Sequence, residues 1–141
     1  MTAMRCTEEA GAVAVEFALV LPILILLVFG SVEFGLALYN KEVITNAGRE
    51  GARAGIIIGD PRPTATQITN VVKASLTGAG WDATKATITV KAPDVVQGCP
   101  ASGVNLTVAV AYPNSFIVLP NFITGFGKNI TLSAQTIMQC E

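Results

Sequence analysis

The sequence contains no histidine and few charged residues, and both shortages restrict what the chain can do. Without histidine there is no Ser-His-Asp or Cys-His catalytic site and no metal site with imidazole ligands. Charged residues make up 13% of the 141 residues, about half the share of an average soluble domain. The net charge of −1 leaves no basic surface of the kind that binds nucleic acid. These absences exclude nucleic-acid binding and most classes of enzyme.

Cysteines are also scarce, and their spacing excludes further kinds of site. The three cysteines form no Cys-x-x-Cys pair, which excludes zinc-finger and thioredoxin-like sites. Asp60, Asp82 and Asp94 fall in predicted turns, and no two acidic residues have a spacing that suits general acid–base catalysis. We therefore predict a non-enzymatic protein without catalytic residues, metal or cofactor.

Apolar residues are abundant, at 51% of the chain, and they concentrate near the N-terminus. Glu16 is the single charged residue between Ala10 and Val32. About 20 apolar residues in a helix cross the ~30 Å hydrocarbon core of a membrane. The run favours a retained transmembrane helix over about residues 12–36. A cleaved secretory signal, the alternative, has a shorter apolar part that ends at a small-residue cleavage site.

Glu16 is unusual because a carboxylate within lipid costs about 2.5–3.5 kcal/mol on insertion scales. Either Glu16 lies at the cytoplasmic edge of the membrane and reaches water, or it pairs with a specific cation. A cut after Gly11 would create such a cation, since the new amino terminus at Ala12 would lie four residues before Glu16. That pair could form within one chain or between two chains.

These residues resemble the class III signal of type IV pilin-like proteins, in which prepilin peptidase cuts after a glycine and a glutamate is the fifth mature residue. Gly11, Ala12, Glu16 and Phe17 fit that pattern. Three successive blocks of the sequence resemble the TadE-like family, which comprises minor pilins or pseudopilins of the Tad (tight adherence) pilus. The blocks that carry this resemblance are Glu16–Pro22, Glu33–Gly35 and Asn46–Ala54.

The resemblance implies a minor pilin that is needed for Tad pilus assembly, is processed by prepilin peptidase and contributes to surface adhesion. Gly11 and Ala12 would form the cleavage junction, and Glu16 and Phe17 would act in processing or assembly. The implied partners are prepilin peptidase, a companion TadF-like minor pilin, the major Flp pilin, the inner-membrane assembly platform and membrane lipid. The implied location is the bacterial cytoplasmic (inner) membrane, crossed once with the N-terminus in the cytoplasm and the C-terminal domain exported, or the pilus itself. The alternative hypothesis is an uncleaved, single-pass membrane-anchored module that binds a ligand.

The apolar helix is predicted to continue well beyond the membrane, because no helix breaker occurs between Gly35 and Gly59. The chain then divides into a cytoplasmic leader (1–11), a long helix (12–58) and an exported domain (59–141). Ala47, Gly51 and Gly55 recur every four residues, which places them on one helix face and predicts close helix packing. The alternative is that the helix ends near residue 48, because glycine destabilises helix interiors.

The exported domain is predicted to be α+β, with one helix packed on a three-stranded antiparallel sheet. Residues 66–76 have helical spacing of apolar residues, with Thr64 or Thr66 as the N-cap. Residues 87–91, 104–112 and 130–139 alternate as strands do. The uncharged, apolar segment Pro113–Gly127 either covers the sheet or forms a surface patch. Trp81 is interpreted as a core or interfacial residue.

A core this small usually needs a covalent staple, which Cys99 and Cys140 can supply. On the chain-entropy model their loop stabilises the domain by roughly 4 kcal/mol. Cys6 would leave with the leader, and the bridge requires an oxidising compartment outside the cytoplasm. The alternative is a pair of reduced, buried thiols.

Overall fold

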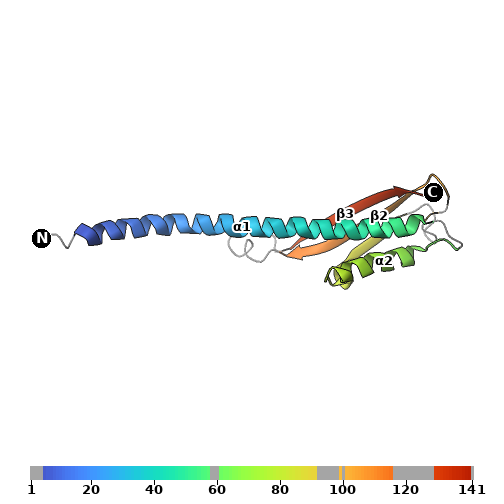
Figure 1. The fold of residues 1–141 in the computed structure, drawn as a ribbon, viewed down its shortest axis with the longest axis horizontal. Coiled ribbons are helices and arrows are strands. Elements are labelled where there is room, and N and C mark those ends of the chain that lie inside the picture. Colours follow the sequence, from blue (N-terminus) through green and yellow to red (C-terminus); the bar gives the residue numbers. More distant parts are fainter. Residues whose placement is uncertain (1–4, 58–60, 92–98, 100, 116–128, 141) are drawn as a thin grey trace. The chain divides into compact units, whose positions relative to one another are not determined.

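The computed structural model describes residues 5–57, 61–91, 99, 101–115 and 129–140, which form two α-helices, one short 3-10 helix and one sheet. The helices are α1 (Arg5–Ile56), α2 (Ala65–Gly78) and the short 3-10 helix η1 (Ala83–Lys85) (Figure 1). The strands are β1 (Thr87–Lys91), β2 (Asn105–Ser115) and β3 (Asn129–Gln139). This confirms the predicted fold class, a long apolar N-terminal helix followed by one helix and a three-stranded antiparallel sheet.

Helix α1 is continuous over 52 residues, with Pro22 inside it. It begins at Arg5 in the uncut chain, so the described residues of the predicted leader are also helical. It ends at Ile56, shortly before the Asp60-Pro61 step, where proline disfavours a helical conformation of the preceding residue. The helix does not end near residue 48, so the alternative of an early end is wrong.

The chain forms two compact units, which we describe separately. One contains the apolar N-terminal residues through Leu36. The other, which we call the C-terminal domain, consists of Ala37–Ser115 and Lys128–Glu141. The last part of α1 thus belongs to the C-terminal domain, where Ile44, Ala47 and Ala52 are buried in the core. From sequence we placed the start of this domain at residue 59, after the helix, whereas the core includes residues on both sides of that point.

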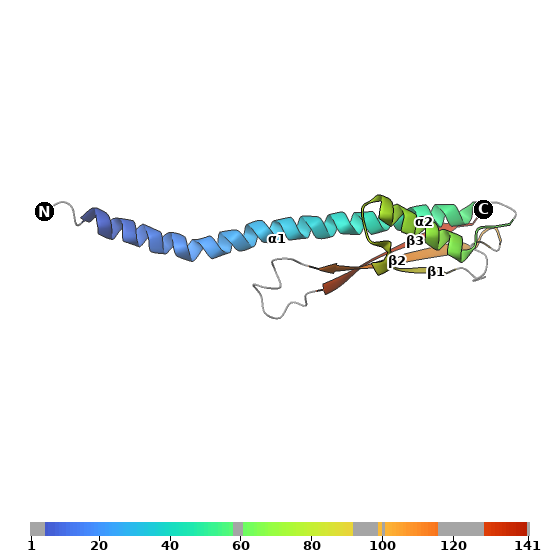
Figure 2. The ribbon, with the colours of Figure 1, turned by 90° about the horizontal axis from the view of Figure 1, so that it is seen from below.

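The sheet has the strand order β1-β2-β3, and both pairs of neighbours are antiparallel. The register aligns the inward side chains, so that Val108 lies between Val90 and Thr136. Leu106, Val108 and Val110 are fully buried, which agrees with the alternation in the sequence. Helices α1 and α2 lie on the same side of the sheet (Figure 2). The predicted apolar segment Pro113–Gly127 is described only to Ser115, where it continues β2, and its remainder lies outside the described residues.

Helix α2 is defined at both ends by local signals. Thr64 Oγ1 accepts a hydrogen bond from the Gln67 N–H, and Gln67 Oε1 accepts one from the Thr64 N–H, which makes a capping box. After the helix Gly80 adopts a φ of +83°, a conformation that glycine enters without strain. The Trp81 N–H then donates to the Leu76 carbonyl at 3.0 Å. The buried face of α2 consists of Ile68, Val72 and Leu76.

Candidate functional site

The N-terminal part of α1 presents apolar side chains on all sides. Every residue from Ala10 to Ile25 is exposed, and Phe17 and Leu19 expose 58% and 71% of their surface. The helix from Ala10 to Ile56 is long and apolar enough to cross a membrane, with a mean hydropathy of 2.8 in its most apolar window. Exposed apolar surface of this extent marks contact with a membrane or a partner. The helix is therefore consistent with a membrane anchor or a signal sequence.

The predicted cleavage junction lies in this exposed part of the helix. Gly11 is exposed, and a side-chain carbon added there would meet no atom within 4 Å. Ala12 follows it in the same helix and is also exposed. The peptide bond between Gly11 and Ala12 therefore lies between two exposed residues, and both residues have helical conformation.

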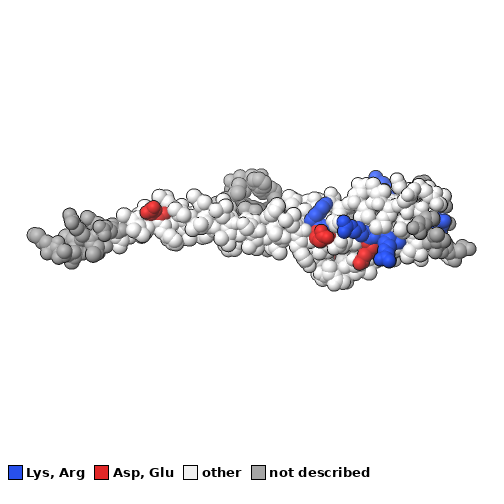
Figure 3. Space-filling view, turned by 45° about the horizontal axis from the view of Figure 1, so that its top comes forward, with Lys and Arg blue, Asp and Glu red and all other residues white. Residues whose placement is uncertain are grey.

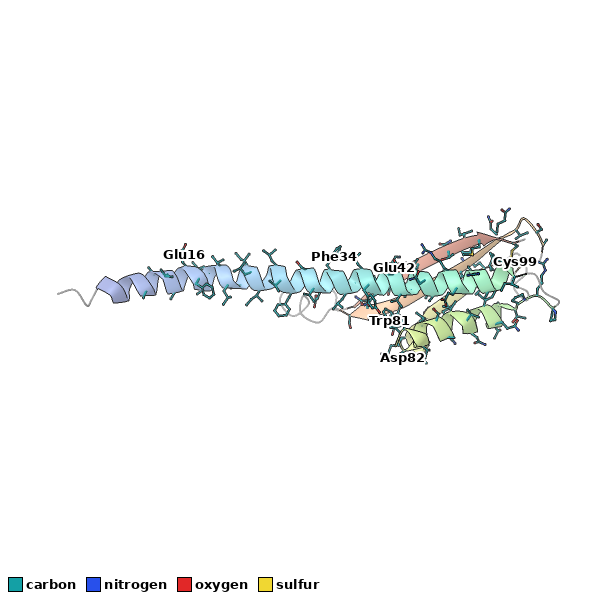
Figure 4. The ribbon with its side chains drawn as sticks, in the orientation of Figure 1. Glu16, Phe34, Glu42, Trp81, Asp82 and Cys99 are labelled. Carbon is teal, nitrogen blue, oxygen red and sulfur yellow. A yellow bond between two sulfur atoms is a disulfide. The ribbon has the colours of Figure 1, made fainter. Side chains whose placement is uncertain are left out.

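Glu16 interrupts an otherwise apolar helix surface. Figure 4 shows its side chain pointing away from the helix, and the face drawn in Figure 3 has one acidic group along the apolar segment. Val13, Phe17 and Val20 surround it and form with it a shallow groove of about 270 Å³. Among the residues that the structure describes, none forms an ion pair or a hydrogen bond with Glu16. Its carboxylate is therefore available to a partner other than these residues.

Glu33, a second acidic residue of α1, has a different environment from Glu16. Only 5% of its surface is exposed, and it takes part in an interaction. Our sequence analysis used Glu33 only as part of a family block and assigned it no role. Its position directly after the apolar run could have singled it out, because a carboxylate near lipid needs a partner.

The small residues that we predicted to form a helix-packing face are all buried within the C-terminal domain. Ala47 is 1% exposed. A side-chain carbon at Gly51 would lie 2.3 Å from Cγ2 of Val72 in α2, and one at Gly55 would lie 2.4 Å from Cδ2 of Leu106 in β2. At Gly51 and Gly55, α1 therefore lies so close to α2 and β2 that a larger residue would clash with them.

We expect Gly51→Ala to destabilise the C-terminal domain relative to Gly48→Ala. Both substitutions gain the same ~1 kcal/mol of helix propensity, but their surroundings differ. At Gly51 the clashing atom belongs to Val72, whose branched side chain has one strongly preferred rotamer in a helix, whereas at Gly48 the nearest atom is Thr136 Oγ1 at 3.4 Å. Overpacking of this kind costs about 1–3 kcal/mol, so the two variants should differ by that amount.

The measurement is urea unfolding of the full chain in detergent micelles, followed by the fluorescence of Trp81, the single tryptophan. Gly48→Ala serves as the matched control because it is in the same helix. Equal stability of the two variants would show that α1 does not pack on α2 through Gly51.

Cys99 and Cys140 form a disulfide with their Cα atoms 5.8 Å apart, which confirms the predicted bridge. The backbone of Cys140 is aligned with the start of β2, since its N–H donates to the Val104 carbonyl and its carbonyl accepts from the Gly103 N–H. The Cys99 carbonyl accepts a hydrogen bond of 2.6 Å from the guanidinium of Arg62. The bridge therefore joins the segment that follows β1 to the end of β3.

Of the three aspartates that the sequence places in turns, only Asp82 lies among the described residues. Asp60 and Asp94 lie outside the described residues. Asp82 accepts hydrogen bonds from the Thr84 hydroxyl and the Thr84 N–H, and these bonds lower the pKa of Asp82. Within the described part of the chain, no group of three or more His, Cys, Asp or Glu side chains could hold a metal ion.

The described chain thus combines a long apolar N-terminal helix with a small α+β domain. The family model described as TadE-like protein matches residues 11–53 of this chain. No curated protein and no solved structure matches it. The match confirms the TadE-like resemblance along α1, from the predicted cleavage junction to the part of the helix in the domain core. It implies a pilin-like protein associated with the Tad pilus.

Proposed function

We propose that this protein is a minor pilin or pseudopilin that is needed for assembly of a Tad pilus and so contributes to surface adhesion. The observation that carries the proposal is that the TadE-like match begins at residue 11 and coincides with the exposed apolar helix. TadE-like pilins are in general structural proteins and not enzymes. The protein would act as a structural subunit of the pilus assembly.

The proposal places the apolar part of α1 in the bacterial cytoplasmic membrane. Each large apolar side chain that leaves water contributes about 1.5–3 kcal/mol, and such side chains are exposed along this helix from Val13 to Tyr39. The N-terminus would lie in the cytoplasm and the C-terminal domain would be exported. The Cys99–Cys140 disulfide supports export of the domain, because such bonds persist in oxidising compartments.

Processing by prepilin peptidase between Gly11 and Ala12 would then prepare the helix for assembly. The cut gives Ala12 a positively charged amino group, which would pair with Glu16 of the same chain or of a neighbouring subunit. Such a pair would offset the cost of placing a carboxylate in lipid. The neighbours would be a companion TadF-like minor pilin, the major Flp pilin and the inner-membrane assembly platform.

The test of this proposal is the mass of the membrane-bound protein from cells that contain the peptidase. We expect wild-type protein to lack residues 1–11 and Gly11→Val to retain them, because a side chain at the cut position hinders close approach of the protease to the backbone. Gly30→Val is the matched control: Gly11 and Gly30 are both helical glycines with no atom within 4 Å of an added side chain. We expect this control to be cleaved like the wild type. Cleavage before Ala12 in Gly11→Val, or uncleaved wild-type protein, would refute the processing step.

The alternative function is an uncleaved, membrane-anchored module that binds a ligand through its C-terminal domain. An open groove in that domain, lined by Trp81 and Tyr112, favours it. The two functions differ in what they require of Glu16, because an anchor has no need of a carboxylate in the membrane whereas pilus assembly does.

A further inference from the structure

The C-terminal domain has an open groove at the end where α2 finishes. Its volume of about 460 Å³ falls within the range of about 300–1,000 Å³ that is typical of small-molecule sites. Figure 4 shows Trp81 and Asp82 beyond the C-terminal end of α2. The lining side chains that matter here are Asn40, Trp81, Asp82, Lys85, Tyr112 and Asn114.

One wall of the groove is aromatic and held in place by the backbone. The ring centroids of Trp81 and Tyr112 are 4.5 Å apart, with the ring planes inclined at 55°. Tyr112 belongs to β2, and the Trp81 N–H bond to Leu76 fixes the chain after α2. Both side chains are only half-buried, and neither the indole N–H nor the phenol O–H bonds to another described residue. The wall thus combines apolar ring surface with two polar groups that no described residue bonds.

The neighbouring charges are balanced. Asp82 Oδ1 accepts hydrogen bonds of 3.0 and 2.6 Å from the N–H and hydroxyl of Thr84. Its other oxygen, Oδ2, lies 3.9 Å from Lys85 Nζ, and both side chains are exposed. This leaves Oδ2 able to accept hydrogen bonds from a ligand. Because one acid faces one base, the groove favours neither an anionic nor a cationic ligand.

The remaining polar wall is made of two carboxamides. Asn40 Nδ2 donates to Asn114 Oδ1 at 2.6 Å, which joins α1 to the end of β2. Within the described part of the chain, the carbonyl oxygen of Asn40 and the amino group of Asn114 form no other hydrogen bond. This wall therefore offers both a donor and an acceptor, which suits hydroxyl groups because each hydroxyl both donates and accepts.

We propose that this groove binds a neutral saccharide, with the C–H face of a sugar ring stacked on the aromatic wall and its hydroxyl groups bonded to Asp82 and the two carboxamides. The balanced charge disfavours phosphate-bearing ligands, and the polar lining disfavours lipid chains. All of the lining residues belong to the C-terminal domain. The inference is therefore independent of the proposed processing of the N-terminal helix and can fail or hold separately from it.

The experiment titrates the full chain, kept in a detergent without a sugar head group, with oligosaccharides. Trp81 is the single tryptophan, so its fluorescence reports directly on the groove. The probes are maltotetraose, for glucose polymers, and chitotetraose, for N-acetylglucosamine polymers. We expect a saturable change with at least one probe, with a dissociation constant of about 1 mM or below. The probe that responds identifies the class of glycan.

Two variants connect the response to the groove. Tyr112→Ala removes part of the stacking surface, and Asp82→Asn keeps the cap on Thr84 while removing the charge; each should raise the dissociation constant about tenfold. Tyr39→Ala is the matched control, since Tyr39 is the other tyrosine, is 57% exposed and does not line the groove. This control should bind like the wild type.

Three results would overturn the inference. The first is the absence of a saturable response to both tetrasaccharides. The second is a response that persists unchanged in Asp82→Asn, a variant whose fold should match the wild type. The third is a Trp81 fluorescence change with a purified pilin partner but with neither sugar, which would make the groove a protein interface.

Discussion

Replacing Glu16 with leucine is expected to leave the protein in the membrane but to abolish its incorporation into pilus assemblies. The change removes the one charged side chain of the apolar run, so insertion becomes easier by about 2.5–3.5 kcal/mol. The variant also lacks the carboxylate that would pair with the new amino group of Ala12, so association between subunits weakens. Breaking a buried ion pair from one side costs about 3–5 kcal/mol, which corresponds to roughly 10²- to 10⁴-fold weaker association.

The measurement is co-purification of the membrane-extracted protein with pilus components, together with pilus counts on cells. Glu50→Leu is the matched control, because Glu50 is an exposed glutamate of the same helix that lies in the C-terminal domain. Membrane extraction of both variants should equal that of the wild type. If Glu16→Leu still co-purified at the wild-type level, the uncleaved anchor would become the better hypothesis.

Loss of the Cys99–Cys140 disulfide is expected to cost about 4 kcal/mol of the free energy of unfolding of the C-terminal domain. The bridge closes a loop with a sequence separation of 41 residues, and the chain-entropy model converts a loop of that size into about this stabilisation. Small domains have only about 5–15 kcal/mol in total. The double variant Cys99→Ala/Cys140→Ala should therefore unfold at a much lower urea concentration.

Unfolding of the full chain in detergent, followed by Trp81 fluorescence, measures this effect under non-reducing conditions. Cys6→Ala is the control, since Cys6 takes no part in the bridge. A loss below about 1 kcal/mol in the double variant would show that other contacts, such as the hydrogen bonds of Cys140 to the start of β2, hold the strands in place without the bridge.

Local patterns predicted the elements of the C-terminal domain closely. The alternation of residues 87–91 coincides with β1, and Thr64, one of the two predicted N-caps, caps α2. These features depend on contacts a few residues apart, which the sequence displays directly. The disulfide could also be inferred, since only two of the three cysteines lie in the predicted exported part.

The candidate site was only partly visible in the sequence. Glu16 stood out because it is the single charge in an apolar run, whereas the burial of Glu33 was not foreseen. Trp81 was interpreted as a core or interfacial residue, and the structure shows it half-buried at the edge of an open groove. The other walls of that groove come from α1 and β2, and no local pattern links these segments.

The sequence by itself determined the apolar helix, the lone Glu16 in it, the strands and helix of the domain and the class of protein to which they point. Each of these depends on periodicity or on the cost of one charge in lipid, which act over a few residues. Only the tertiary structure decided that Gly51 and Gly55 bring α1 against α2 and β2. It also decided that Asn40 meets Asn114 across 74 residues, beside the Trp81–Tyr112 pair. These contacts join segments that are distant in sequence. They form only when the apolar faces of those segments pack together in the folded domain, so no local pattern reveals them.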